Sequence, residues 1–313
     1  MLTRSAYLVA LLLICFPAKS GPPVVHYSIG TGSKGATFYP VAAALCQLIS
    51  NAELGFTCGA VESPGSRYNL DGLQRGEFDL ALSQVSLQYQ AWRGVLPFYT
   101  QHKNVRTLAP LHREVFILAV RPGLKVTRLR DLQGRRLNIG NEGSGSRVII
   151  ERLLQFLALD QVGFTIHGAR SAELPELFCN GEIDAAIYST GHPNTIYSQL
   201  IDECGVELVD LWNEQIAGFV ESSWEIETAM IPGNTYIGIT GNRYGFGEQV
   251  VMSAHREMPP DHVAKILEIL KGEKEALAEI APIYKSIQVD GEQLQRAAPN
   301  HRGVEEYFSG GMQ

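Results

Sequence analysis

The sequence lacks a long apolar run, a metal-binding cluster and a block of basic residues. Its longest apolar stretch, Ala6 to Phe16, has eleven residues, about half of the ~20 that a membrane-spanning helix needs. The eight histidines are scattered and no Cys-x-x-Cys occurs, so we expect no metal site. With 33 acidic against 26 basic residues, the chain is poorly suited to neutralise phosphates, which argues against nucleic-acid binding.

Catalytic motifs are also missing. The sequence has no Gly-x-Ser-x-Gly and no Gly-Lys-Ser/Thr. Gly30-x-Gly32-x-x-Gly35 matches the dinucleotide-binding fingerprint, with Glu53 about twenty residues further on. Glu53 follows the first helix, however, rather than ending a second strand. A dinucleotide-binding enzyme is therefore the less favoured alternative, and we expect neither catalysis nor a cofactor.

The first twenty residues have the pattern of an export signal. Arg4 precedes the apolar run, and Ala18-Lys19-Ser20 places small residues at a cleavage site before Gly21. Cleavage would leave 293 residues and change the net charge from −7 to −9. We therefore expect a soluble, monomeric periplasmic protein of two domains.

Few cysteines are present, and they fall in two local pairs. Cleavage removes Cys15 and leaves Cys46, Cys58, Cys179 and Cys204. In an oxidising compartment an even number of cysteines indicates disulfides. Three pairings are possible, and locality alone favours Cys46–Cys58 and Cys179–Cys204. Four unpaired thiols are the alternative.

The two halves of the chain repeat one pattern. Residues 24–29 and 136–139 are predicted strands, each followed by a Gly/Ser loop and a helix, over about 37–49 and 146–157 respectively. Leu73 to Leu82 (LQRGEFDLAL) resembles Phe178 to Ile187 (FCNGEIDAAI). This alternation predicts two α/β lobes with parallel strands and helices on both faces. A long helix beginning at residues 259–261 is expected to pack back on the first lobe.

Both Gly/Ser loops lead into helix N-termini, where free N–H groups and the helix dipole favour anions. If the lobes face each other, both loops would point at one cleft. Arg147 lies in the first turn of the second helix, where the dipole disfavours a cation, so it is a candidate partner for a carboxylate. Arg67 is a weaker candidate. A solvated side chain is the alternative for both.

Five segments of the sequence carry a family resemblance: GTGSKGATFYP at 30–40, ESPGSRYNL at 62–70, GEFDLALSQ at 76–84, NIGNEGSGS at 138–146 and GEIDAAIYSTGHP at 181–193. Together they resemble the TAXI-type solute-binding proteins of tripartite ATP-independent periplasmic (TRAP) transporters. The resemblance runs from about Tyr27 to the tail. The sequence departs from the family pattern at Arg67, at His192 and in its two cysteine pairs.

The resemblance implies a type II-like periplasmic binding fold with a ligand cleft between two lobes. The expected division is a signal peptide at 1–20, a discontinuous first lobe at 21–114 and 248–313, and a second lobe at 115–247. It implies capture of a small anionic solute, such as glutamate, glutamine or 2-oxoglutarate, and delivery to a TRAP-type permease. A sensor acting with a membrane histidine kinase, or a surface antigen, would look the same in sequence.

The resemblance also assigns solute-binding residues by position. They are Thr31, Ser33, Thr37 and Tyr39 in the first loop, Ser66, Asn69, Gln84 and Ser86 elsewhere in the first lobe, and Ser144, Ser146 and Thr190 in the second. With Arg67 and Arg147 they form the predicted site.

Overall fold

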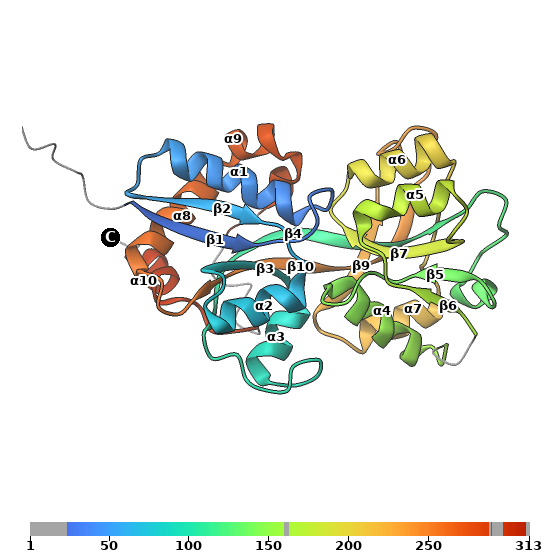
Figure 1. Ribbon diagram of the computed structural model, residues 1–313, viewed down its shortest axis with the longest axis horizontal. Coiled ribbons are helices and arrows are strands. Elements are labelled where there is room, and N and C mark those ends of the chain that lie inside the picture. Colours follow the sequence, from blue (N-terminus) through green and yellow to red (C-terminus); the bar gives the residue numbers. More distant parts are fainter. Residues whose placement is uncertain (1–23, 160–162, 288, 290–296, 311–313) are drawn as a thin grey trace, which may run out of the picture.

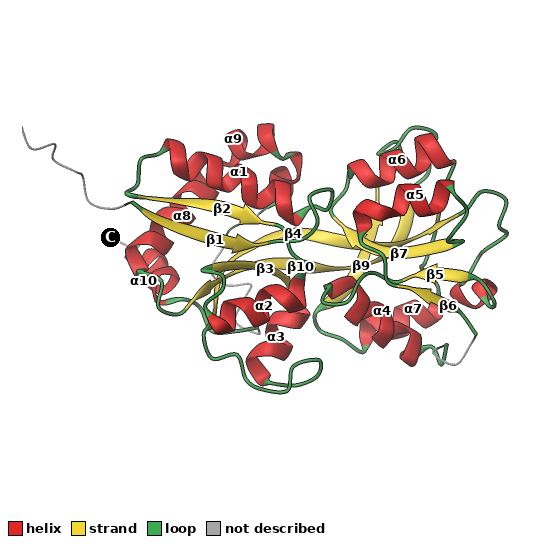
Figure 2. Cartoon of the chain, viewed as in Figure 1, coloured by secondary structure: helices red, strands yellow, loops and turns green. Residues whose placement is uncertain are grey.

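The computed structural model describes residues 24–159, 163–287, 289 and 297–310. They form two α/β lobes that lie side by side, each with helices on both faces of its strands (Figure 1, Figure 2). The expected export signal, residues 1–20, lies outside the described residues. Within the described ranges no helix is long and apolar enough to cross a membrane.

Ten strands and ten α-helices carry the fold in the described part of the chain. The strands are β1 (Val25–Gly30), β2 (Phe56–Val61), β3 (Leu80–Gln84), β4 (Val105–Val120), β5 (Arg136–Asn138), β6 (Thr165–His167), β7 (Ala185–Thr190), β8 (Glu207–Val209), β9 (Ile226–Ile231) and β10 (Arg243–His255). The helices are α1 (Phe38–Asn51), α2 (Ser66–Arg75), α3 (Val85–Arg93), α4 (Gly145–Phe156), α5 (Leu174–Cys179), α6 (Thr195–Cys204), α7 (Glu214–Glu221), α8 (Pro260–Gly272), α9 (Lys274–Ile280) and α10 (Arg302–Gly310). Three short 3₁₀ turns are η1 (Leu129–Leu132), η2 (Ser171–Glu173) and η3 (Pro282–Ser286).

The strands form one continuous sheet in the order β2-β1-β3-β10-β4-β7-β5-β6, with β8 on β4 and β9 on β10. Strands β1, β2 and β3 are parallel, as are β5, β6 and β7. The prediction of parallel strands fails for β4 and β10, which pair antiparallel. The physical reason is their path: β4 leads from the first lobe into the second, and β10 returns.

Both predicted lobe boundaries fall on these crossing strands, after residues 114 and 247. Glu114 on β4 lies directly opposite Glu248 on β10. Nearby the register shifts between Gln249 and Val251, an irregularity that locally increases twist and bending. The crossing strands therefore connect the two lobes, and we call the segment around Glu114 and Glu248 the hinge.

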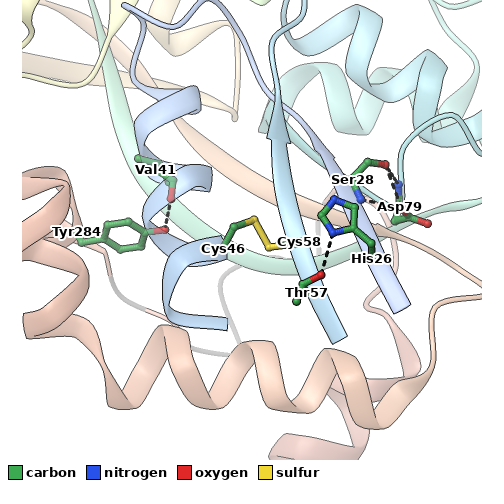
Figure 3. The surroundings of a disulfide bond; sticks show 8 residues. All are labelled: His26, Ser28, Val41, Cys46, Thr57, Cys58, Asp79 and Tyr284. Carbon is green, nitrogen blue, oxygen red and sulfur yellow. Dashed lines mark hydrogen bonds between the residues drawn. A yellow bond between two sulfur atoms is a disulfide. The ribbon is translucent and has the colours of Figure 1, made fainter. Parts of the chain in front are cut away.

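The first lobe has its own apolar core. Ile29 of β1, Leu45 of α1 and Ile266 of α8 are fully buried in one cluster. The hydroxyl of Tyr284 in η3 donates a hydrogen bond to the carbonyl oxygen of Val41 in α1, at 2.8 Å (Figure 3). The C-terminal helices are thereby packed onto the first lobe.

Each lobe contains one disulfide. Cys46 of α1 is bonded to Cys58 of β2 (Figure 3), and Cys179 at the end of α5 is bonded to Cys204 at the end of α6. The Cα atoms of the two pairs are 5.0 and 4.9 Å apart. These are the two pairings that sequence locality favours.

The repeated Gly-Glu-x-Asp motif has the same place in both lobes. In the first, a carboxylate oxygen of Asp79 accepts from the backbone N–H and the hydroxyl of Ser28 on β1, at 2.8 and 3.0 Å. In the second, Asp184 accepts from the backbone N–H of Arg136 on β5, at 3.0 Å. Each aspartate thus joins the start of its buried strand to the first strand of its lobe.

Candidate functional site

A polar cavity lies between the two lobes, beside the hinge. Helix starts and strand ends from both sides line it, with hydroxyl groups as the dominant side-chain chemistry. Its lining residues are Gly32, Ser33, Ala36, Phe38, Pro64, Gly65, Ser66 and Gln84 from the first lobe, Glu114 at the hinge, and Gly140, Asn141, Ser144, Gly145, Ser146, Ser171, Tyr188 and Ser189 from the second.

Glycine allows the two lobes to approach closely at the cavity. A Cβ added at Gly145 would overlap the side chain of Gln84 and come within 2.9 Å of the Ser66 hydroxyl. On the facing lobe, Gly65 has a φ of +126°, and a Cβ there would meet the backbone of Ser144 at 3.1 Å. The glycines therefore permit contacts that any larger residue would obstruct.

Direct hydrogen bonds join the lobes around the cavity. Thr37 Oγ1 lies 2.6 Å from Thr190 Oγ1. The amide of Gln84 donates to the Ser189 hydroxyl at 3.0 Å, and the amide of Asn141 donates to the carbonyl oxygen of Pro64, also at 3.0 Å. Because each bond has one partner in each lobe, the structure represents the closed arrangement.

Glu114 places a buried carboxyl group in the cavity wall. One of its oxygens, Oε2, accepts from the Gln84 amide at 3.2 Å and from the Ser189 hydroxyl at 3.0 Å. The other, Oε1, has no hydrogen-bond partner among the described residues and lies 3.9 Å from His112 Nε2. The residue is 4% exposed. Oε1 therefore keeps its capacity to accept a hydrogen bond.

Tyr188 contributes a second group without a partner. Its hydroxyl is buried and makes no hydrogen bond of good geometry within the described part of the chain, although the side chains of Ser171 and Thr190 lie close enough to influence its pKa. Burial raises its pKa above the usual value, so it stays a neutral O–H. A buried hydroxyl without a partner is costly in a folded protein, and a polar solute in the cavity would satisfy it.

The N-terminus of α4 points free N–H groups at the same space. Gly145 and Ser146 begin the helix, so no carbonyl within it can accept from their N–H groups. The first turn of α2 on the facing side is already occupied, because the N–H groups of Arg67 and Tyr68 donate to the carbonyl oxygen of Gly143. The α4 terminus therefore offers an unoccupied anion-binding position.

Five of the predicted site residues line the cavity: Ser33, Ser66, Gln84, Ser144 and Ser146. Thr37 and Thr190 lie at its edge, where they form the hydrogen bond between the lobes.

Four others have contacts outside the cavity lining. The Thr31 hydroxyl donates to the carbonyl oxygen of Val61 at 2.7 Å. The amide of Asn69 donates to the carbonyl oxygens of Thr31 and Leu82. The N–H of Ser86 donates to Glu248, and Tyr39 lies half-buried beneath the ammonium of Lys34. These contacts organise the strands and helices behind the cavity.

The two predicted arginines are not among the residues that line the cavity. The guanidinium of Arg147 donates to Glu151 one helical turn further on, at 2.8 Å, and lines a separate depression beside α4. Arg67 participates through its backbone N–H, and its side chain forms no ion pair with any described residue. The misplaced charge at the start of α4 is thus compensated within the helix itself, by an i,i+4 pair.

Sequence reasoning missed Glu114, Asn141, Ser171, Tyr188 and Ser189. A signal for Glu114 was present, since His112-Arg113-Glu114 interrupts an otherwise apolar strand over residues 108–120. Polar residues in the middle of a long buried strand indicate a crossing point or a site. Asn141, Tyr188 and Ser189 lie in segments already assigned to the cleft, whereas Ser171, in η2, lies outside all of these segments.

Comparison with known proteins agrees with this geometry. A family model described as the NMT1-like family matches residues 29–310. The periplasmic binding protein BugD superposes with a TM-score of 0.54 at 14% identity, covering 87% of this chain and 89% of its own. A putative L-cystine ABC transporter protein from Listeria monocytogenes gives 0.53 at 13% identity, covering 86% and 100%.

The alkanesulfonate-binding protein SsuA from Xanthomonas axonopodis pv. citri, solved with MOPS bound, gives a TM-score of 0.51 at 15% identity, covering 88% of this chain and 90% of that chain. At such identities the likeness concerns the fold alone. The two-lobed, type II-like periplasmic binding fold is thereby confirmed.

Proposed function

The chain belongs to the NMT1-like family, and from this premise we propose that it is a periplasmic solute-binding protein that closes its two lobes around a small carboxylate-bearing solute. The export signal at residues 1–20 would deliver it to the periplasm. A TRAP-type permease in the membrane would receive the solute. The role is binding, without catalysis.

The observation that carries this proposal is the cavity whose walls come from both lobes. Gln84 of the first lobe and Ser189 of the second hydrogen-bond each other and also Glu114 at the hinge. Such contacts exist only when the lobes are closed. A solute that binds both walls would therefore favour the closed state by its difference in affinity for the two states.

The cavity chemistry supports a small polar solute. A carboxylate would accept from the free N–H groups of Gly145 and Ser146 at the start of α4, and the hydroxyls of Ser33 and Tyr188 would complete its surroundings. Glutamate, glutamine and 2-oxoglutarate are the first candidates, because the motifs of both glycine loops resemble those of TAXI-type binding proteins.

The test is small-angle scattering combined with thermal unfolding, with and without each candidate solute. Binding should reduce the radius of gyration and raise the melting temperature. A ligand at ~100 times its dissociation constant adds roughly 2.7 kcal/mol to the free energy of unfolding. No change in either quantity across a panel of amino acids and dicarboxylates would overturn the proposal.

The partner permease is tested separately. One matched structure is described as part of an ABC transporter, so an ABC-type permease is the second candidate. Uptake in vesicles that carry the partner encoded beside this gene separates the two: dependence on a sodium gradient supports a TRAP-type partner, and dependence on ATP supports the ABC-type partner.

A further inference from the structure

We propose that Glu114 selects solutes that carry a protonated amine, so that the protein binds amino acids and discriminates against the corresponding 2-oxo acids. This inference rests on the proposed function, since it names the solute class for the same cavity.

The first argument is the charge of the wall. Among the described residues that line the cavity, Glu114 is the only one with a carboxyl group, and none is a lysine, arginine or histidine. Neither predicted arginine supplies positive charge to this lining: Arg147 pairs with Glu151, and Arg67 is not one of the lining residues. A solute with only negative groups would bring like charge against Glu114.

The second argument is the position of the free carboxylate oxygen. Glu114 Oε2 already accepts two hydrogen bonds, from Gln84 and Ser189, whereas Oε1 accepts none from the described residues. The nearest nitrogen of a basic side chain, Nε2 of His112, is 3.9 Å away, beyond hydrogen-bond distance. Among the described residues no lysine or arginine pairs with this buried carboxyl group. A poorly compensated buried carboxylate is costly, and an ammonium group of the solute would compensate its charge.

The third argument is that hydrogen-bond donors and an acceptor line one cavity. The start of α4 provides N–H donors for a carboxylate, and Glu114 provides an acceptor for an amine. An α-amino acid carries these two groups on one carbon atom. A 2-oxo acid replaces the amine by a carbonyl oxygen, which can only accept, and would therefore face an acceptor.

The experiment compares matched pairs that differ only at this carbon: L-glutamate with 2-oxoglutarate, and L-alanine with pyruvate. Calorimetry on the wild-type protein should show amino acids binding at least about tenfold more tightly than their 2-oxo partners, since hydrogen bonds to charged groups are worth about one to two factors of ten. Glu114→Gln should remove most of this preference.

Glu248→Gln is the matched control. Glu248 lies opposite Glu114 on the neighbouring strand and is equally buried, but it does not line the cavity. It should leave the preference intact. Glu114→Asp keeps the carboxylate on a shorter side chain, so it should weaken amino-acid binding while retaining part of the preference. Melting temperatures establish that each variant folds.

Two results would overturn the inference and leave the proposed function standing: equal binding of both members of each pair by the wild type, or an unchanged preference in Glu114→Gln. A purely structural role for Glu114 would lower the affinity for both members alike and would also overturn it. Failure of every amino acid and 2-oxo acid to bind would overturn both the inference and the proposed solute.

Discussion

The two glycine loops that face each other across the cavity share one pattern and use it differently. In the second lobe, the hydroxyl of Ser144 accepts from the N–H of Arg147 and caps its own helix, α4. In the first lobe, Thr37 stands at the corresponding start of α1 but makes no side-chain cap. Its hydroxyl bonds Thr190 in the other lobe instead. One copy of the motif stabilises a helix, and the other joins the lobes.

The second repeat shows a similar divergence. Asp79 is held by Ser28, a neutral residue. Asp184 is held by the guanidinium groups of Arg136 and Arg121 at 2.9 and 3.1 Å, in addition to a backbone N–H. These bonds, above all those from Arg136, lower the pKa of Asp184 to about 2. Both copies of the motif therefore connect two strands through an aspartate. Among the described residues, only the aspartate of the second lobe also pairs with arginines.

The largest expected effect comes from adding a methyl group to the second glycine loop. Gly145→Ala would push its Cβ into Gln84 and obstruct closure. Overpacking of this kind costs about 1–3 kcal/mol, so solute binding should weaken roughly tenfold or more. In the first loop, a Cβ at Gly32 would meet its nearest neighbour, Phe38, at 3.8 Å. Gly32→Ala should therefore leave lobe closure unobstructed, and scattering together with calorimetry checks both variants.

The next effect separates the two aspartates. Asp184→Asn leaves Arg136 and Arg121 without their carboxylate partner. Both arginines are about one-third exposed, so we expect the free energy of unfolding to fall by roughly 1–3 kcal/mol, less than breaking a fully buried pair would cost. Asp79→Asn should cost less, since its partner is neutral. Urea unfolding of the two variants at pH 7 measures the difference, and equal losses would contradict the comparison.

The same aspartate predicts a pH dependence. The pKa of Asp184 is lower in the folded state than its ordinary value of 3.8, so its stabilising contribution is fully present above about pH 4 and disappears as the pH falls to about 2. The destabilisation by Asp184→Asn should shrink over this window. Urea unfolding of wild type and variant between pH 5 and 2 tests this, and a constant difference would contradict it.

The smallest effects distinguish the cap from the bond between lobes. Ser144→Ala removes a helix cap and should lower the free energy of unfolding by about 1 kcal/mol. Thr37→Val removes the bond to Thr190 and the acceptor of the Gly191 N–H, both in the other lobe. It should therefore weaken solute binding several-fold and change the free energy of unfolding less, because Thr190 retains a bond from the Asn194 amide at 3.2 Å. Chemical unfolding and calorimetry on both variants would reveal whether these two roles are in fact separate.

Much of the fold could be predicted from local patterns. The expected strand at 24–29 is β1 at Val25–Gly30, and the expected helix at 37–49 is α1 at Phe38–Asn51. The helix expected from residues 259–261 is α8 at Pro260–Gly272. These elements were accessible because periodicity, glycine turns and proline act within a few residues of chain. The antiparallel crossing of β4 and β10 was not, since it depends on partners more than 100 residues apart.

The site was less accessible than the fold. The serine positions could be predicted from the glycine-rich loops. Four of the predicted serines line the cavity: Ser33, Ser66, Ser144 and Ser146. The direction of Arg147 did not follow, because the same position on α4 allows either a solute or Glu151 as partner. Glu114 was missed because the polar run at 112–114 indicates a crossing point or a site without specifying which of its side chains lines the cavity.

The sequence by itself determined the order and connection of the secondary-structure elements. Each half of the chain has a strand, a glycine loop and a helix, with an aspartate that joins two strands. The sequence did so because hydrogen bonds and steric limits within a short segment need no distant partner. Only the tertiary structure decided the charge of the cavity. It pairs Arg147 with Glu151, leaves Arg67 out of the cavity lining and places Glu114 in that lining. Electrostatic character depends on distance and burial in space, which chain order alone does not specify.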